Sequence, residues 1–144
     1  MPSLTTRLQN LQQTGPLIEV LISPSSALRA VLEKENKPIP QPVKRMMLID
    51  TGASASAIKT GIAKELGLTP HGTISIATAS HKSHVCLTYD VDIIFSLQKV
   101  GLQNVRVFET RFEGQNIDGL IGRDVLRLGV LIYNGYDQSF TLSF

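Results

Sequence analysis

The sequence predicts a single mostly β domain with one or two short helices. Three observations support this prediction: short apolar runs of strand length recur, turn-forming residues separate them, and few stretches show helical spacing. The 144 residues are enough to bury most of one apolar core, and 42% hydrophobic and 18% charged residues are ordinary for a globular chain. Many short strands favour a barrel or a sandwich.

The predicted elements follow one another with short connections. In chain order they are a polar arm over residues 1–15, a strand over 16–23, a helix over 27–35, a proline-rich linker up to residue 42, a strand over 43–49, a helix over 60–66, strands over 73–79, 85–95 and 100–109, helical turns over 123–128, and strands over 130–133 and 138–144.

The N-terminal arm is the least defined of these elements. Leu4, Leu8 and Leu11 are at helical spacing, so residues 1–15 are expected to form a short amphipathic helix or a loose arm. Residues 16–144 are expected to form the domain itself.

Turn chemistry sets the other boundaries. Pro24 and the serines after it form a turn and an N-cap, and with the later prolines they make residues 24–42 a helix-and-proline insertion between two strands. The strands around a polar tip make residues 73–95 one hairpin. Asn134-Gly135 is a strong turn signal for the final hairpin.

Composition excludes several functions. The net charge is only +2 and no Lys/Arg cluster would follow a phosphate backbone, so no nucleic-acid partner is expected. No apolar run reaches the roughly 18 residues of a membrane span, so no membrane partner is expected. With Cys86 as its single cysteine, the chain cannot form an internal disulfide. This is typical of proteins in a reducing compartment, so a cytoplasmic location is expected.

Two motifs carry the candidate chemistry. Asp50-Thr51-Gly52 follows the apolar run 46–49 and precedes small residues, which is how a strand delivers one carboxylate into a tight turn. Farther along, residues 117–126 contain a hydrophobic-hydrophobic-Gly pattern. In this order and at this spacing, the pair resembles the retropepsins, the single-domain aspartic proteases related to those of retroviruses.

The resemblance covers most of residues 43–144 and implies a retropepsin-like acid-protease barrel. It makes Asp50 the catalytic acid and Thr51, Gly52 and Ala53 the rest of the active-site turn. Thr51 would hydrogen-bond across a dimer axis, and Gly52 would let the backbone approach substrate closely. Because Ala53 has no hydroxyl to favour the charged carboxylates, activity is expected at mildly rather than strongly acidic pH.

The resemblance also implies a lid and a support for the turn. The hairpin of residues 73–95 matches the flap that closes over substrate, with Ala79, Ser80, His81 and Lys82 as the substrate-binding tip, although this tip lacks the usual glycines. Structural support would come from Ile121, Gly122 and Arg123. The family arginine usually meets an acid, but the matching position is Ser54, so that ion pair is expected to be absent or rerouted. Residues 141–144 resemble a strand that interleaves with the partner.

One Asp-Thr-Gly provides only half of an aspartic protease site. Peptide hydrolysis in this family needs two carboxylates that share a proton. The sequence therefore predicts a homodimer in which Asp50 meets Asp50 of a second copy, an aspartic endopeptidase acting on peptide or protein substrates. No cofactor is expected, and no metal either, because His81 and His84 have no third ligand nearby.

Some of these residues also have simpler explanations. Asp50 alone is also an ordinary turn residue, and Cys86 is better explained as a packed strand residue than as a nucleophile. The alternative function is a non-catalytic retropepsin-fold module that binds peptides as a dimer. A further alternative is a self-processing precursor that loses its first 15 or so residues.

Overall fold

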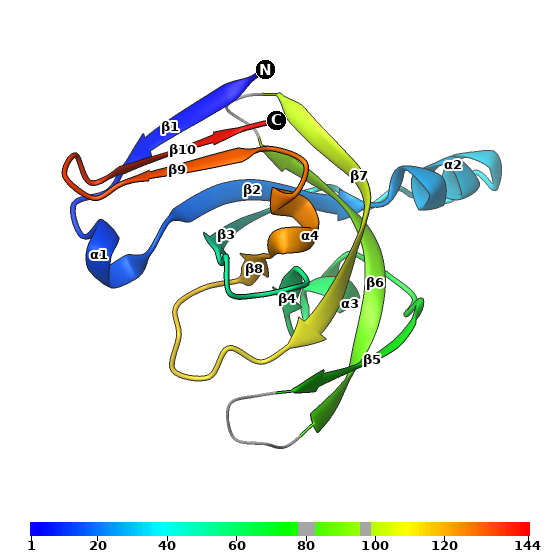
Figure 1. Ribbon diagram of the computed structural model, residues 1–144. Helices are drawn as coiled ribbons and strands as arrows, with labels where there is room; N and C mark the ends of the chain where they lie inside the picture. Colours follow the sequence, from blue (N-terminus) through cyan, green and yellow to red (C-terminus); the bar gives the residue numbers. More distant parts are fainter. Residues whose placement is uncertain (78–82, 96–98) are drawn as a thin grey trace.

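The computed structural model describes residues 1–77, 83–95 and 99–144 (Figure 1). The elements in chain order are β1 (Ser3–Arg7), α1 (Leu11–Thr14), β2 (Leu17–Pro24), α2 (Ser26–Lys34), β3 (Val43–Ile49), β4 (Ala57–Lys59), α3 (Ile62–Glu65), β5 (Gly72–Ala77), β6 (Ser83–Phe95), β7 (Val100–Thr110), β8 (Gly119–Ile121), α4 (Arg123–Leu126), β9 (Val130–Asn134) and β10 (Ser139–Ser143).

Six strands close into a barrel. Around the barrel they follow the order β2-β3-β8-β4-β7-β6, and the pairing of β6 with β2 closes the ring. β5 extends the sheet beyond β6 as the other arm of a hairpin. The β3–β8 and β4–β7 pairs are parallel. The prediction of a mostly β barrel with short helices is therefore confirmed.

The core lies inside this barrel because side chains alternate between the two faces of each strand. Ile18, Val20 and Ile22 of β2 point inward and are buried, as are Val91 and Ile93 of β6. Side chains of the second sheet and the short helices join the same cluster, namely Leu11, Ile62, Ala63, Leu66, Val125, Phe140 and Leu142. One continuous core thus supports both sheets.

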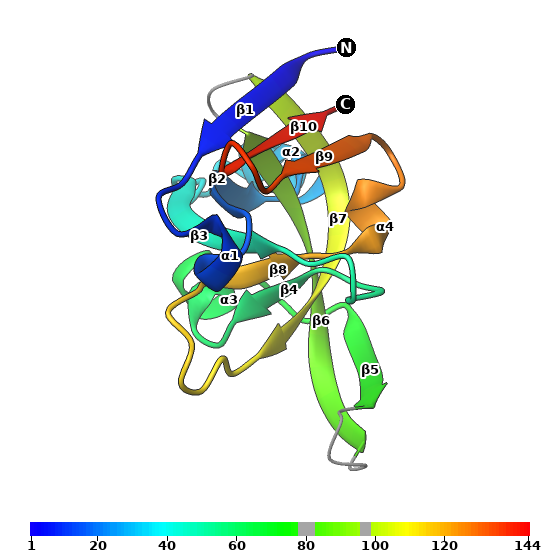
Figure 2. The ribbon, with the colours of Figure 1, turned by 60° about the vertical axis from the view of Figure 1, so that its left-hand side comes forward.

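A second sheet of three strands has the order β1-β10-β9. It lies at one end of the barrel, with both chain termini beside it, while the β5–β6 hairpin extends from the other end (Figures 1 and 2). β10 is the central strand, so both of its edges are paired within the chain. This arrangement departs from the interleaving of residues 141–144 with a partner that the resemblance implied.

The N-terminal residues differ from the expectation of an amphipathic helix or a loose arm. Residues 3–7 form β1, whose backbone pairs with β10, and only residues 11–14 are helical. An extended conformation is favoured over a helix here because Leu4 and Leu8 pack against the core cluster while the backbone is hydrogen-bonded to β10. The helical spacing of Leu4, Leu8 and Leu11 therefore did not correspond to a helix over residues 1–15.

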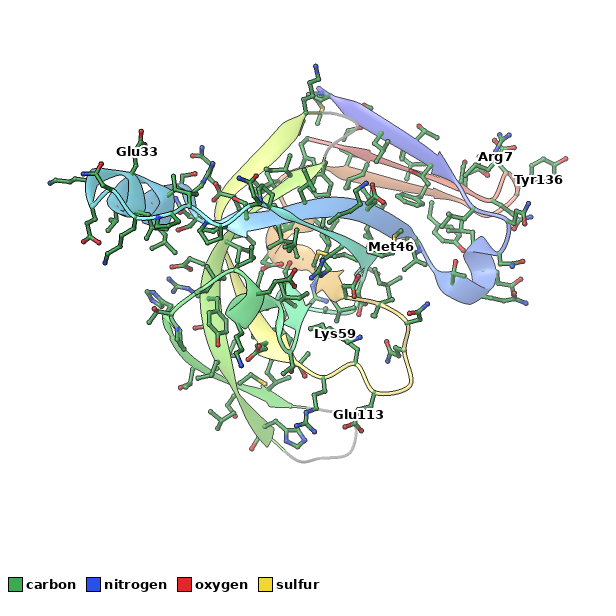
Figure 3. The ribbon with its side chains drawn as sticks, turned by 180° about the vertical axis from the view of Figure 1, so that it is seen from behind. Arg7, Glu33, Met46, Lys59, Glu113 and Tyr136 are labelled. Carbon is green, nitrogen blue, oxygen red and sulfur yellow. The ribbon has the colours of Figure 1, made fainter. Side chains whose placement is uncertain are left out.

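Helix α2 stands out from the barrel, with Glu33 at its outer part (Figures 1 and 3). Its base is held by Asp92, a side chain of β6 that is only 3% exposed. Asp92 accepts hydrogen bonds from Ser26 Oγ at 2.5 Å, Arg29 Nη2 at 2.7 Å and the backbone N of Asn104 at 2.9 Å. None of the helices that the structure describes is long and apolar enough to cross a membrane.

The Asp92→Ala variant is expected to lower the free energy of unfolding by about 2–3 kcal/mol, because three hydrogen-bond donors lose a buried acceptor. Urea denaturation followed by circular dichroism measures the change. Glu33→Ala, on the exposed side of α2, is the control and should change it by less than about 0.5 kcal/mol. Equal losses in the two variants would contradict this account of how α2 is anchored.

Candidate active site

Asp50 lies in the turn of residues 50–56, which connects β3 to β4. Its backbone N donates to the O of Ile121 at 2.9 Å, so the turn begins as a continuation of the β3–β8 pairing. Its Oδ1 accepts from the backbone N of Gly52 at 2.8 Å. Asp50 is half-buried, and the hydrogen bond from Gly52 orients its carboxylate.

Arg123 clamps the same turn from α4. Its Nη1 donates to the backbone O of Thr51 at 2.7 Å, and its backbone N donates to the O of Ala53 at 2.9 Å. The guanidinium thus binds a carbonyl. The resemblance implied an acidic partner for it, but Ser54, at the matching position, has no carboxylate. Of the two outcomes expected for this arginine, the structure has the rerouted one.

A buried hydroxyl links the turn to the second motif. Ser56 is fully buried, and its Oγ donates to Asp124 Oδ1 at 2.8 Å and accepts from the backbone N of Gly122 at 3.0 Å. The backbone N of Ser56 donates to the other Asp124 oxygen, Oδ2, at 3.0 Å. Neither Ser56 nor a role for Asp124 was predicted from the sequence. The sequence signal that could have indicated this contact was a hydroxyl residue shortly after the first motif and an acidic residue within the second.

Only glycine fits at position 122, because there is no room for a Cβ atom. A Cβ at this position would lie 2.7 Å from the backbone C and 2.8 Å from the O of Ala55. Any larger residue would therefore push the turn away from α4. Ile121 and Gly122 are both buried directly beneath the turn, so the structure brings together all three residues predicted to support it.

A cavity of about 400 Å³ lies between the turn and strand β5. Small residues of the turn form one side, and larger apolar side chains form the other. Its lining consists of Gly52, Ala53, Ser54, Ala55, Ile74, Ser75, Ile76, Ala77, Phe108 and Leu120. This lining contains no charged side chain. The cavity can therefore hold an apolar side chain of an extended peptide.

The predicted flap is only partly described. Its arms are β5 and β6, but the tip residues Ala79, Ser80, His81 and Lys82 lie outside the described residues. Near the base of the hairpin, Tyr89 meets Glu109 of β7. Burial, together with the charge of Glu109 and a hydrogen bond to it, raises the pKa of Tyr89. The phenol therefore remains a neutral hydrogen-bond donor at physiological pH.

Other carboxylates near the motifs are engaged in the structure. Asp118 Oδ2 accepts from the backbone N of Met46 at 2.9 Å, and both Asp124 oxygens bind Ser56. Asp50 is the carboxylate of the turn beside the cavity, and its Oδ1 accepts from the backbone N of Gly52, which lines that cavity. Among the described residues, no three metal-ligating side chains lie close enough to hold a metal ion.

The comparisons with known proteins agree with this geometry. An aspartyl protease family profile matches residues 36–125, which is more than half of the chain and includes the turn, the cavity residues and all but the last residue of the second motif. The chain belongs to the aspartyl protease family. No curated protein sequence matches the chain.

A solved structure shares the fold of this family member. It is a retropepsin-like aspartic protease from Rickettsia conorii, at 17% sequence identity and a TM-score of 0.57. The alignment covers 97% of this chain and 89% of the other. The retropepsin-like barrel expected from the two motifs is therefore confirmed as the fold.

The Ser56→Ala variant tests the link between the turn and the second motif. We expect a loss of about 1–3 kcal/mol in the free energy of unfolding, because the half-buried carboxylate of Asp124 and the buried N–H of Gly122 each lose a partner. Urea denaturation measures the loss. The exposed hydroxyl of Ser54 offers a control in the same turn, and Ser54→Ala should stay close to wild type. Matching stabilities for the two variants would show that the hydrogen bonds of Ser56 are unimportant.

Proposed function

We propose that this protein is a homodimeric aspartic endopeptidase in which each copy contributes one Asp50. The observation that carries the proposal is the position of that carboxylate in a clamped turn beside an uncharged cavity. Membership of the aspartyl protease family supports it. Thr51, Gly52 and Ala53 would complete the active-site turn, with Ile121, Gly122 and Arg123 as its support.

The chemistry requires a second copy. Two carboxylates in close contact cannot both ionise, so they share one proton. The charged carboxylate takes a proton from a water molecule, which then attacks the peptide carbonyl carbon. The neutral carboxylate donates its proton to the carbonyl oxygen. A two-fold axis beside the turn would bring Asp50 against its own copy without any further residue.

The cavity indicates the kind of substrate. Because Ile74, Ile76, Phe108 and Leu120 line it, an apolar side chain next to the cleaved bond is expected to bind there. The hairpin of residues 73–95 would close over the extended peptide and exclude water. No cofactor or metal takes part in this reaction. A cytoplasmic location remains a prediction that rests on the single free Cys86.

The Asp50→Asn variant should lower peptide cleavage by about a hundredfold to ten-thousandfold, since an amide cannot exchange the protons that the reaction needs. Cleavage of a peptide library between about pH 4 and 7 measures this. Glu33→Gln is the matched control, because it makes the same carboxylate-to-amide change on the exposed side of α2. Peptides that bind but stay intact with wild type would favour the non-catalytic module.

A mixing experiment tests whether two acids act together. Adding an excess of Asp50→Asn protein to a constant amount of wild type is expected to reduce cleavage, because wild-type chains are drawn into dimers with only one carboxylate. The initial rate, measured after subunits have exchanged, reports the effect. An excess of Asp50→Asn protein that leaves this rate unchanged would mean that a single chain suffices.

A further inference from the structure

Strands β6 and β7 separate near the hairpin and leave a fork between them. Their pairing ends with Thr88 opposite Phe108. Beyond this pair, residues 83–87 of β6 pair only with β5 among the described strands, whereas Glu109 and Thr110 of β7 pair with β4. The chain after β7 then turns away from β6 (Figure 1). The Thr88–Phe108 pair is therefore the base of the fork.

A cavity of about 860 Å³ lies in this fork. Its walls include His84 from β6, Glu109 from β7, and Arg111 and Glu113 from the loop that follows β7. In Figure 3, Glu113 lies at the same end of the molecule as the β5–β6 hairpin. The fork cavity is larger than the apolar cavity beside the active-site turn and, unlike it, is lined by charged side chains.

The two cavities are neighbours. Phe108 lines the apolar cavity, and the next residue, Glu109, lines the fork cavity. On the hairpin, Ile74 lines the apolar cavity, and Cys86, with which it is paired, lines the fork cavity. Neighbouring strands are only about 4.8 Å apart. An extended peptide that places one side chain in the apolar cavity can therefore place another in the fork cavity.

Glu109 has no counterion in this cavity. Its Oε1 accepts from the backbone N of Gly61 at 3.1 Å, and its carboxylate is also hydrogen-bonded to Tyr89. Both partners are neutral, and none of the ion pairs among the described residues includes Glu109. Burial first, and the charge of Glu109 second, raise the pKa of Tyr89. A half-buried carboxylate of this kind attracts a cation more strongly than a fully solvated one.

The other charged groups of the fork cavity lie at its solvated rim. Arg111 Nη1 is 4.0 Å from Glu113 Oε1, and these two side chains are 78% and 83% exposed. Their charges offset each other and are screened by water. His84 is exposed as well, so water also screens its ring. The half-buried part of the cavity is thus negatively charged through Glu109.

We propose that the fork cavity is a second substrate subsite that binds a lysine or arginine side chain of the peptide, with Glu109 as the residue that selects it. The ammonium or guanidinium group would donate to the carboxylate, whose lone pairs are not all used by Gly61 and Tyr89. Thr60 and Thr110 also line the cavity, and a hydroxyl oxygen can accept a further hydrogen bond. The inference rests on the proposed protease and specifies its substrate: an apolar residue beside the cleaved bond and a basic residue farther along.

Paired peptides test this selection. Lysine is scanned through the positions of a peptide that wild type cleaves, beside the same scan with norleucine, which has no charge. At one position, kcat/KM should be about tenfold higher with lysine. Glu109→Gln should bring the two values within about twofold of each other, because the amide has no charge. Glu33→Gln, the same change on the exposed side of α2, is the control and should keep the wild-type ratio.

A lysine preference that disappears in Glu109→Gln and remains in Glu33→Gln supports the subsite. The absence of any lysine preference in wild type overturns it, as does a preference that Glu109→Gln retains. Circular dichroism checks that each variant is folded, and Glu109→Met replaces Glu109→Gln if the latter does not fold.

Peptide binding separates the subsite from the proposed chemistry. Isothermal titration calorimetry with the Asp50→Asn protein compares the affinities for the lysine and norleucine peptides without cleavage. About tenfold tighter binding of the lysine peptide, lost when Glu109→Gln is added, supports the subsite even where wild type does not cleave. Equal affinities overturn the subsite, even where wild type cleaves peptides through Asp50. Cleavage that persists in Asp50→Asn would instead overturn the protease proposal.

Discussion

The structure depends on one constraint, the attachment of the Asp50 turn to the residues around Gly122. The turn and the second motif are distant in sequence, but the parallel pairing of β3 with β8 brings them together. Ser56 then joins Asp124 to the backbone N of Gly122, and Arg123 joins α4 to the Thr51 carbonyl. An acid that must act in one geometry needs such support, because a displacement of about 1 Å can cost much of the rate.

The rest of the fold serves this attachment. The closed barrel buries its alternating side chains and leaves no open edge in the ring, which fixes the ends of β3 and β8 relative to each other. The lack of a Cβ on Gly122 lets α4 approach the turn closely. The strand edges that remain unpaired among the described residues belong to β5 of the hairpin and to the outer strands of the second sheet. The open strand edges thus lie outside the closed ring that holds the carboxylate.

The sequence predicted those parts of the fold that have local signals. The strand over residues 43–49 has the predicted bounds, and the turn after it was identified from its small residues. β4 and β8 were missed because three residues are too few to show an alternating pattern. β1 was missed because its partner, β10, lies at the other end of the chain.

The candidate site shows the same division. Ile121, Gly122 and Arg123 were identified from a short motif, and the absence of an acid at position 54 indicated that the usual ion pair of Arg123 would be absent or rerouted. Its actual partner, the carbonyl of Thr51, could not be predicted because every residue has a carbonyl. Ser56 and Asp124 were missed since each is ordinary in its own segment, and their importance comes only from the contact between them.

The pairing of the first strand with the last has a consequence for how the molecule assembles. Ser3 lies opposite Ser143, so this contact closes a loop that contains almost all of the chain. Loop closure costs more entropy as the loop lengthens, and contacts of this kind slow folding. On the ribosome, β1 has no partner until synthesis has proceeded as far as β10. The barrel can form before that time, and the three-stranded sheet is completed last.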